Sequence, residues 1–169
     1  MTVAARCRLA AGLFAAVLGF CALVSPAAAL TEEEAGKVTR LLGELQPELG
    51  SLAYDEEAAD DWFDRDQESE GRIEKAGFSR EGWKEALDAT FRGYLATIPE
   101  AEFEGRFANI EARLEASSTL TAEQKAAMRE MFEEERAKTR ALRAEGRQYL
   151  DIIRPYADLL DAALGEPSP

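Results

Sequence analysis

The stretch SREGWKEALDATFRGYLATIP, residues 79–99, decides the fold class of this 169-residue chain. Its large apolar residues recur three or four positions apart, which is the spacing of one face of an α-helix. Ser79 is a suitable N-cap for that helix, and Pro99 is a suitable stop. We therefore predict an amphipathic helix with one apolar face, formed by Trp83, Leu87, Phe91, Tyr94, Leu95 and Ile98.

The same spacing continues on the N-terminal side of this stretch. Thr31 and Glu34 have the spacing of a capping box, so a helix is expected to begin there. Pro47 lies inside the apolar pattern that follows and predicts a kink or a restart of the helix. The apolar positions of this helix are Val38, Leu41, Leu42, Leu45, Leu49 and Leu52.

Helical spacing also continues on the C-terminal side. Pro99 fits the first turn of a second helix, which the polar run 117–119 ends. Thr121 and Gln124 then form a second capping box, from which a long helix runs to Pro155. The apolar positions of these two helices include Phe103, Phe107, Ile110, Leu114, Met128, Met131, Phe132, Leu142, Tyr149, Leu150 and Ile153.

These patterns predict an all-α fold. No run alternates apolar and polar residues in the manner of a strand. We expect a helical hairpin or small bundle with a long C-terminal helix kinked near Pro155. Residues 30–169 should form a single helical domain, with an acidic segment at 48–70 and a frayed tail at 165–169. Apolar residues are sparse at 132–142, so this part of the long helix should be exposed.

The first 29 residues have the layout of a secretory signal peptide. Arg6 and Arg8 form a positive start, residues 9–24 are almost wholly apolar, and Ala27–Ala29 offer small residues for cleavage. This leader predicts export to the periplasm or secretion. The alternative is an uncleaved leader that remains as a membrane anchor, since the apolar stretch is just long enough to span a bilayer.

The charge of the chain limits its partners. It has 33 acidic and 20 basic residues and a net charge of −13, which disfavours nucleic acid and, after cleavage, anionic membranes. Suitable partners are basic proteins, unfolded clients with positive segments, or metal ions. The acidic segment 48–70 and the basic stretch 136–147 are expected to attract each other, within one chain or across a homodimer.

The residue types needed for most catalytic sites are missing. The chain has no histidine, and both cysteines, Cys7 and Cys21, fall in the leader. No glycine-rich phosphate loop appears, and the carboxylates are too numerous for one acid–base pair to stand out. We therefore predict neither an enzyme nor a bound cofactor.

Residues 66–74 resemble the first part of a calcium loop. Aspartate or glutamate occupies positions one, three, five and nine, and glycine occupies position six, but position twelve is Gly77 rather than the required Glu. A charged helix surface ending in a turn explains the stretch better than a calcium loop does. As candidate metal ligands we take Asp64, Asp66, Glu68, Glu70 and Glu74.

The stretch LTAEQKAAMREM, residues 120–131, resembles the LTxxQ motif of the small periplasmic helical proteins of the Spy/CpxP type. Residues 30–34, LTEEE, resemble a second copy with Glu34 in place of Gln. The resemblance implies an all-helical, cradle-like dimer that holds unfolding envelope proteins without ATP, or that senses metal or envelope stress. The candidate client-binding residues are Leu120, Thr121, Gln124, Met128, Met131 and Phe132.

The sequence thus supports three functional hypotheses. The first is an exported, non-enzymatic protein with a chaperone-like or envelope-stress role, in which an apolar helix face covers hydrophobic segments of a client. Met128, Met131 and Phe132 fit a soft binding surface, although methionines at helical spacing are more often core residues. The second is an acidic cation-binding protein. The third is a structural protein of the cell envelope whose helices pair with a partner subunit.

Overall fold

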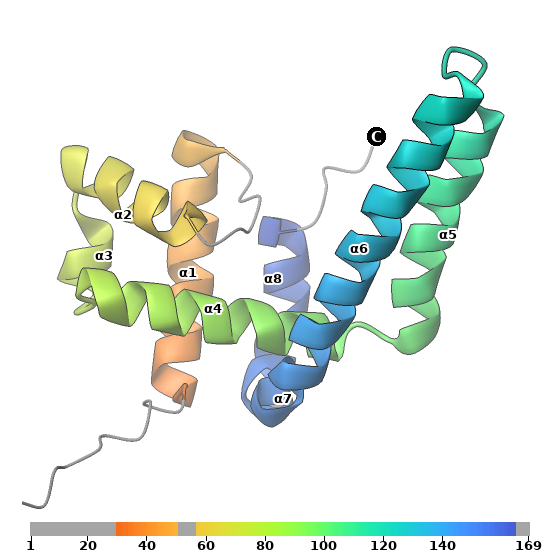
Figure 1. The fold of residues 1–169 in the computed structure, drawn as a ribbon. Coiled ribbons are helices and arrows are strands. Elements are labelled where there is room, and N and C mark those ends of the chain that lie inside the picture. Colours follow the sequence, from red (N-terminus) through yellow and green to blue (C-terminus); the bar gives the residue numbers. More distant parts are fainter. Residues whose placement is uncertain (1–29, 51–56, 165–169) are drawn as a thin grey trace, which may run out of the picture.

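A computed structural model of the chain describes residues 30–50 and 57–164. Within these two ranges all regular structure is helical and no strand occurs, so the all-α prediction is confirmed (Figure 1). The signal-peptide prediction, Leu52 and the tail at 165–169 lie outside the described residues.

Helix α4, Arg80–Thr97, is the element on which the other helices pack (Figure 1). It begins as predicted, because the Ser79 hydroxyl accepts a hydrogen bond of 3.1 Å from the Gly82 N–H. Trp83 is fully buried, and its indole N–H donates a 3.0 Å hydrogen bond to the Ala59 carbonyl oxygen. The apolar face of α4 therefore lies at the centre of the protein's body. We use this name for the described residues outside the helical hairpin at 100–146, which are 30–50, 57–99 and 147–164.

Helix α1, Glu32–Leu49, crosses α4 and begins at the predicted capping box of Thr31 and Glu34. The predicted restart at Pro47 is wrong, because the helix continues through this residue to Leu49. Pro47 has no N–H to donate to the Gly43 carbonyl oxygen, so α1 continues with one backbone hydrogen bond fewer. The helix instead ends at Gly50, whose φ of 88° is strained for any other residue.

Helices α2, Ala58–Glu68, and α3, Arg72–Lys75, follow a segment outside the described residues. Trp62 and Phe63 are buried and hold α2 against the core. Gly77, with φ 98°, ends the α3 turn.

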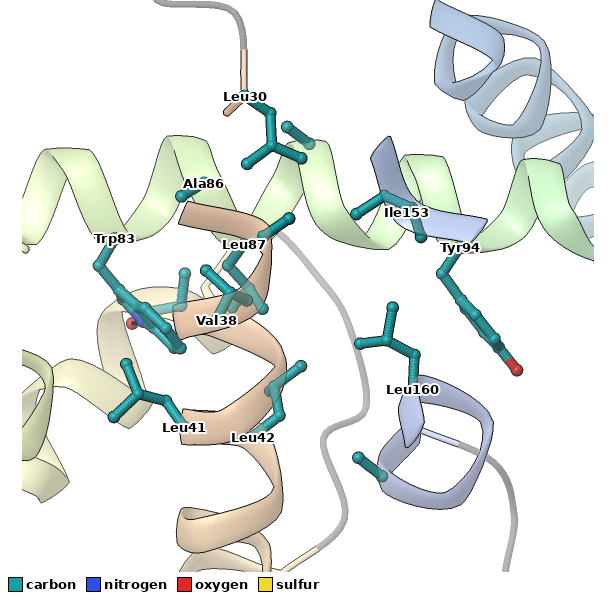
Figure 2. Close-up of a cluster of buried hydrophobic side chains, with 14 of the residues drawn as sticks. Leu30, Val38, Leu41, Leu42, Trp83, Ala86, Leu87, Tyr94, Ile153 and Leu160 are labelled. Carbon is teal, nitrogen blue, oxygen red and sulfur yellow. Dashed lines mark hydrogen bonds between the residues drawn. The ribbon is translucent and has the colours of Figure 1, made fainter. Parts of the chain in front are cut away.

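The core lies where α1, α4 and the C-terminal helices meet (Figure 2). Burying these side chains contributes roughly 25 cal/mol per Å² of apolar surface removed from water. Figure 2 shows the central residues, which are Leu30, Val38, Leu41, Leu42, Trp83, Ala86, Leu87, Tyr94, Ile153 and Leu160.

Helices α5, Glu100–Ala116, and α6, Ala122–Gly146, form an antiparallel hairpin that projects from one end of α4 (Figure 1). In this hairpin only Phe103, Leu114 and Gly146 are buried. The sparse apolar pattern at 132–142 therefore does correspond to an exposed part of the helix.

The C-terminal part reverses direction and returns to the body. Turns η1, Arg147–Tyr149, and η2, Arg154–Tyr156, flank the short helix α7, Leu150–Ile153, and helix α8, Ala157–Leu164, packs beside α1 (Figure 1). The break that the sequence predicts near Pro155 corresponds to η2. The chain already leaves the α-helical path at Arg147, eight residues earlier.

Two glycines allow α4 to lie directly against the chain where α6 ends and η1 and α7 follow. A Cβ atom on Gly146 would come within 1.8 Å of the Arg92 carbonyl oxygen, and one on Gly93 within 2.6 Å of an Ile153 side-chain carbon. Both distances are too short for any real side chain. The crossing at these glycines fixes the point at which the hairpin leaves the body.

Candidate functional site

A groove runs along the far end of the α5–α6 hairpin and encloses a volume of about 320 Å³. Ile110 and Leu114 lie one helical turn apart on α5, and Met128 and Phe132 lie one turn apart on α6, so each helix forms one apolar wall. Ile110 is 38% exposed. The complete lining is Ile110, Arg113, Leu114, Ser117, Leu120, Met128 and Phe132.

The structure divides the six predicted client-binding residues into three groups. Leu120, Met128 and Phe132 line the groove. Thr121 and Gln124 instead form the capping box of α6, in which the Thr121 hydroxyl accepts from the Gln124 N–H at 3.2 Å and the Gln124 amide oxygen accepts from the Thr121 N–H at 2.9 Å. Met131 is 54% exposed and does not line the groove.

Sequence reasoning missed the contribution of α5 to this groove. Ile110 and Leu114 were recognised as one helix face, but nothing in their spacing shows which helix that face meets. Arg113 and Ser117 carry no sequence signal that marks them as groove residues, because their positions depend on the packing of α5 against α6.

Ion pairs join the two helices of the hairpin. Arg129 lies 2.6 Å from Glu115, and Arg136 and Arg140 both pair with Glu104. Hydrogen bonds from Arg136 and then from Arg140 lower the pKa of the Glu104 carboxyl below its ordinary value. Arg136 also lies 3.8 Å from Glu111.

These contacts correct the predicted attraction within one chain between the basic stretch 136–147 and the acidic segment 48–70. The arginines of α6 pair mainly with acids of α5, while Asp60 and Asp64 of the acidic segment pair with Arg80 of α4. Helix packing places these partners closer than any residue of the opposite segment.

Arg143 of α6 stabilises the end of the hairpin that lies next to α4. Its guanidinium donates to the carbonyl oxygens of Leu95, at 3.1 Å, and Ile98, and it pairs with Glu100. It also lies 5.2 Å from the ring centroid of Phe103, within the range of a cation–π contact. The side chain therefore ties α6 to the corner between α4 and α5.

Three of the five predicted metal ligands have other structural roles. Asp66 is 1% exposed, and its Oδ2 accepts a 2.8 Å hydrogen bond from the Ile73 N–H, which caps α3. Asp64 pairs with Arg80, and Glu70 lies 3.1 Å from Arg72. Within the described residues no three His, Cys, Asp or Glu side chains are grouped so as to hold a metal ion. The structure thus does not assemble Asp64, Asp66, Glu68, Glu70 and Glu74 into a site.

A second groove, of about 350 Å³, lies between α1 and α8. Leu159, which is 62% exposed, is the one large apolar residue in its lining. The other lining residues are small or polar: Thr39, Arg40, Gly43, Gln46, Ala162 and Ala163. The hairpin groove, with five large apolar residues, is therefore the stronger candidate for binding a hydrophobic partner.

None of the helices that the structure describes is long and apolar enough to cross a membrane. No known protein family, curated protein or solved structure gives a significant match to this chain.

Proposed function

We propose that this chain is an exported, non-enzymatic helical protein that binds apolar segments of other proteins in the hairpin groove. One observation carries the proposal: five large apolar side chains line an open groove at the end of a hairpin that projects from the body. Apolar patches that remain exposed on a folded protein often mark interaction sites. A groove between two helices is a common receptor for the apolar face of a third.

The surroundings of the groove suit a chaperone-like role. Met128 is unbranched and adapts its shape to different apolar partners. The strongly acidic surface of the chain would keep a complex with an exposed client in solution. The resemblance of residues 120–131 to the LTxxQ proteins agrees with this proposal, and in this chain Leu120 of that motif contributes to the groove.

Light scattering of an aggregating client protein tests the proposal. We expect the wild-type chain to suppress aggregation at both low and moderate salt, because apolar contacts are insensitive to screening. The variant M128A/F132A should lose most of this suppression. The variant M131A is the matched control, since Met131 lies on the same helix but outside the groove lining.

Three results would count against the proposal. The first is a wild-type chain that leaves aggregation unchanged at molar excess. The second is equal suppression by the wild type and by M128A/F132A, because the activity would then come from another surface. The third is suppression that disappears with salt, which would indicate charge attraction to a basic client instead of apolar binding.

The proposed location is the periplasm, supported by the leader sequence at residues 1–29. Expression of the full chain in a Gram-negative host should yield a shortened product in the periplasmic fraction. N-terminal sequencing should find Leu30 as its first residue. A full-length product in the membrane fraction would instead favour the uncleaved anchor.

A further inference from the structure

Arg113 is the one charged residue in the lining of the hairpin groove. Its neighbours in the hairpin differ from it, because Arg106, Arg129 and Arg136 each form an ion pair with a carboxylate. Within residues 30–50 and 57–164, no carboxylate lies within ion-pair distance of Arg113, and its side chain is exposed. This cation is therefore available to a partner.

The nearby acids do not neutralise Arg113. Glu115 is engaged by Arg129 at 2.6 Å, and its carbonyl oxygen accepts a 2.7 Å hydrogen bond from Lys125. Glu111 lies 3.8 Å from Arg136. Both glutamates are thus directed toward α6, while Arg113 lies at the groove.

The position of Arg113 relative to the apolar walls is specific. It follows Ile110 by three residues and precedes Ser117 by four, so the three share one edge of α5 and form the α5 rim of the groove. A guanidinium beside an apolar surface attracts a carboxylate more strongly than one in open water, because the local dielectric constant is lower. Arginine also presents paired N–H donors that match a carboxylate.

From this arrangement we infer that the groove takes an amphipathic helical segment that carries an Asp or Glu beside its apolar residues, and that Arg113 pairs with this carboxylate. The inference rests on the proposed function and names the partner that the groove selects. The net charge of −13 favours basic partners for the chain as a whole, whereas the charge in the groove favours an acidic flank. Arg113 would then determine the register and orientation of the bound helix, since the apolar walls alone allow sliding.

Three synthetic peptides test this inference. Each peptide has about 18 residues, a length sufficient to form a helix on binding. Leucine residues at helical spacing form one face, and the other positions are alanine or glutamine. The peptides differ only at one position flanking the leucines, which is Glu, Gln or Lys. Fluorescence anisotropy measures the binding of each to the full chain, at low and at moderate salt.

We expect the Glu peptide to bind about fivefold more tightly than the Gln peptide, and the Lys peptide to bind most weakly. The variant R113E should reverse this order, and R113Q should remove it. The matched control is K138E, which changes the net charge by the same amount at a residue of α6 outside the groove lining. K138E should keep the wild-type order.

The outcomes separate the inference from the proposed function. If no peptide binds to the wild-type chain, the proposed function itself fails. If all three peptides bind equally and R113E changes nothing, apolar binding in the groove stands and the role of Arg113 is overturned. If K138E changes the order as much as R113E does, overall charge explains the preference, and the inference is likewise overturned.

Discussion

A Cβ atom on Gly146 would lie 1.8 Å from the carbonyl oxygen of Arg92, so α6 can meet α4 there only because residue 146 lacks a side chain. The obstacle is backbone, which cannot rotate away as a flexible side chain can. A single residue type thus decides how the hairpin joins the body of the protein.

Replacing Gly146 with alanine should therefore destabilise the protein by about 3 kcal/mol or more, because α4 and α6 must move apart. Urea unfolding measures this loss. The matched control is G105A, also in a hairpin helix, where a Cβ atom meets nothing within 4 Å. That substitution should stabilise the protein by about 1 kcal/mol through helix propensity. Equal effects of the two variants would show that the crossing is not as tight as the structure indicates.

Asp66 supports a second prediction at the scale of one residue. Its buried Oδ2 accepts from the Ile73 N–H, so D66A would leave that backbone group without its partner. We expect a loss of about 1–3 kcal/mol in the free energy of unfolding. D66N keeps an oxygen acceptor and should lose less. E68A, at an exposed neighbour, is the control and should have little effect. A D66A variant as stable as E68A would contradict the capping role.

At the scale of elements, ion pairs and a thin apolar contact hold α5 against α6. Glu104 receives Arg136 and Arg140, and its pKa is lowered from its ordinary value of 4.5. A carboxyl whose pKa is lower in the folded state stabilises the fold above the pKa of the unfolded chain. That contribution is lost as the pH falls through the lower, folded-state value.

The variant E104Q should consequently melt at a lower temperature than the wild type at pH 7. The difference should shrink once the pH falls below 4.5 and vanish when Glu104 is protonated in the folded state too. Thermal melts from neutral to acidic pH measure this difference. E130Q is a suitable control, since Glu130 is an exposed residue of α6 for which no ion pair occurs in the described part of the chain. A constant difference for E104Q at all pH values would exclude the ionised carboxyl as its cause.

At the scale of the whole molecule, burial is uneven. The body contains almost all of the buried residues, whereas the hairpin buries little beyond Phe103 and Leu114. Because local stability follows buried apolar contacts, the far end of the hairpin should open independently of the body. The groove thus lies in the part of the protein best able to adapt to a partner.

Native-state hydrogen exchange tests this division. Amides of α4 and α1 should be protected to nearly the full free energy of unfolding, while those of residues 108–134 should exchange with much lower protection. Addition of a peptide that occupies the groove should slow exchange in 108–134 and leave α1 unchanged. Uniform protection across both regions would show that body and hairpin open as one unit.

The sequence by itself determined the helices and their starts. Side-chain spacing and capping act within a few residues, so the helix faces around Trp83 and the capping boxes at Thr31 and Thr121 were all predicted correctly. These successes have one reason, which is that the interactions concerned are local.

Only the tertiary structure decided which faces meet. The contribution of Ile110 and Arg113 to the groove, the crossing at Gly146 and the capping role of Asp66 all depend on helices distant in sequence or on a turn whose path is set by packing. Long-range packing of this kind leaves no periodic trace in a single sequence.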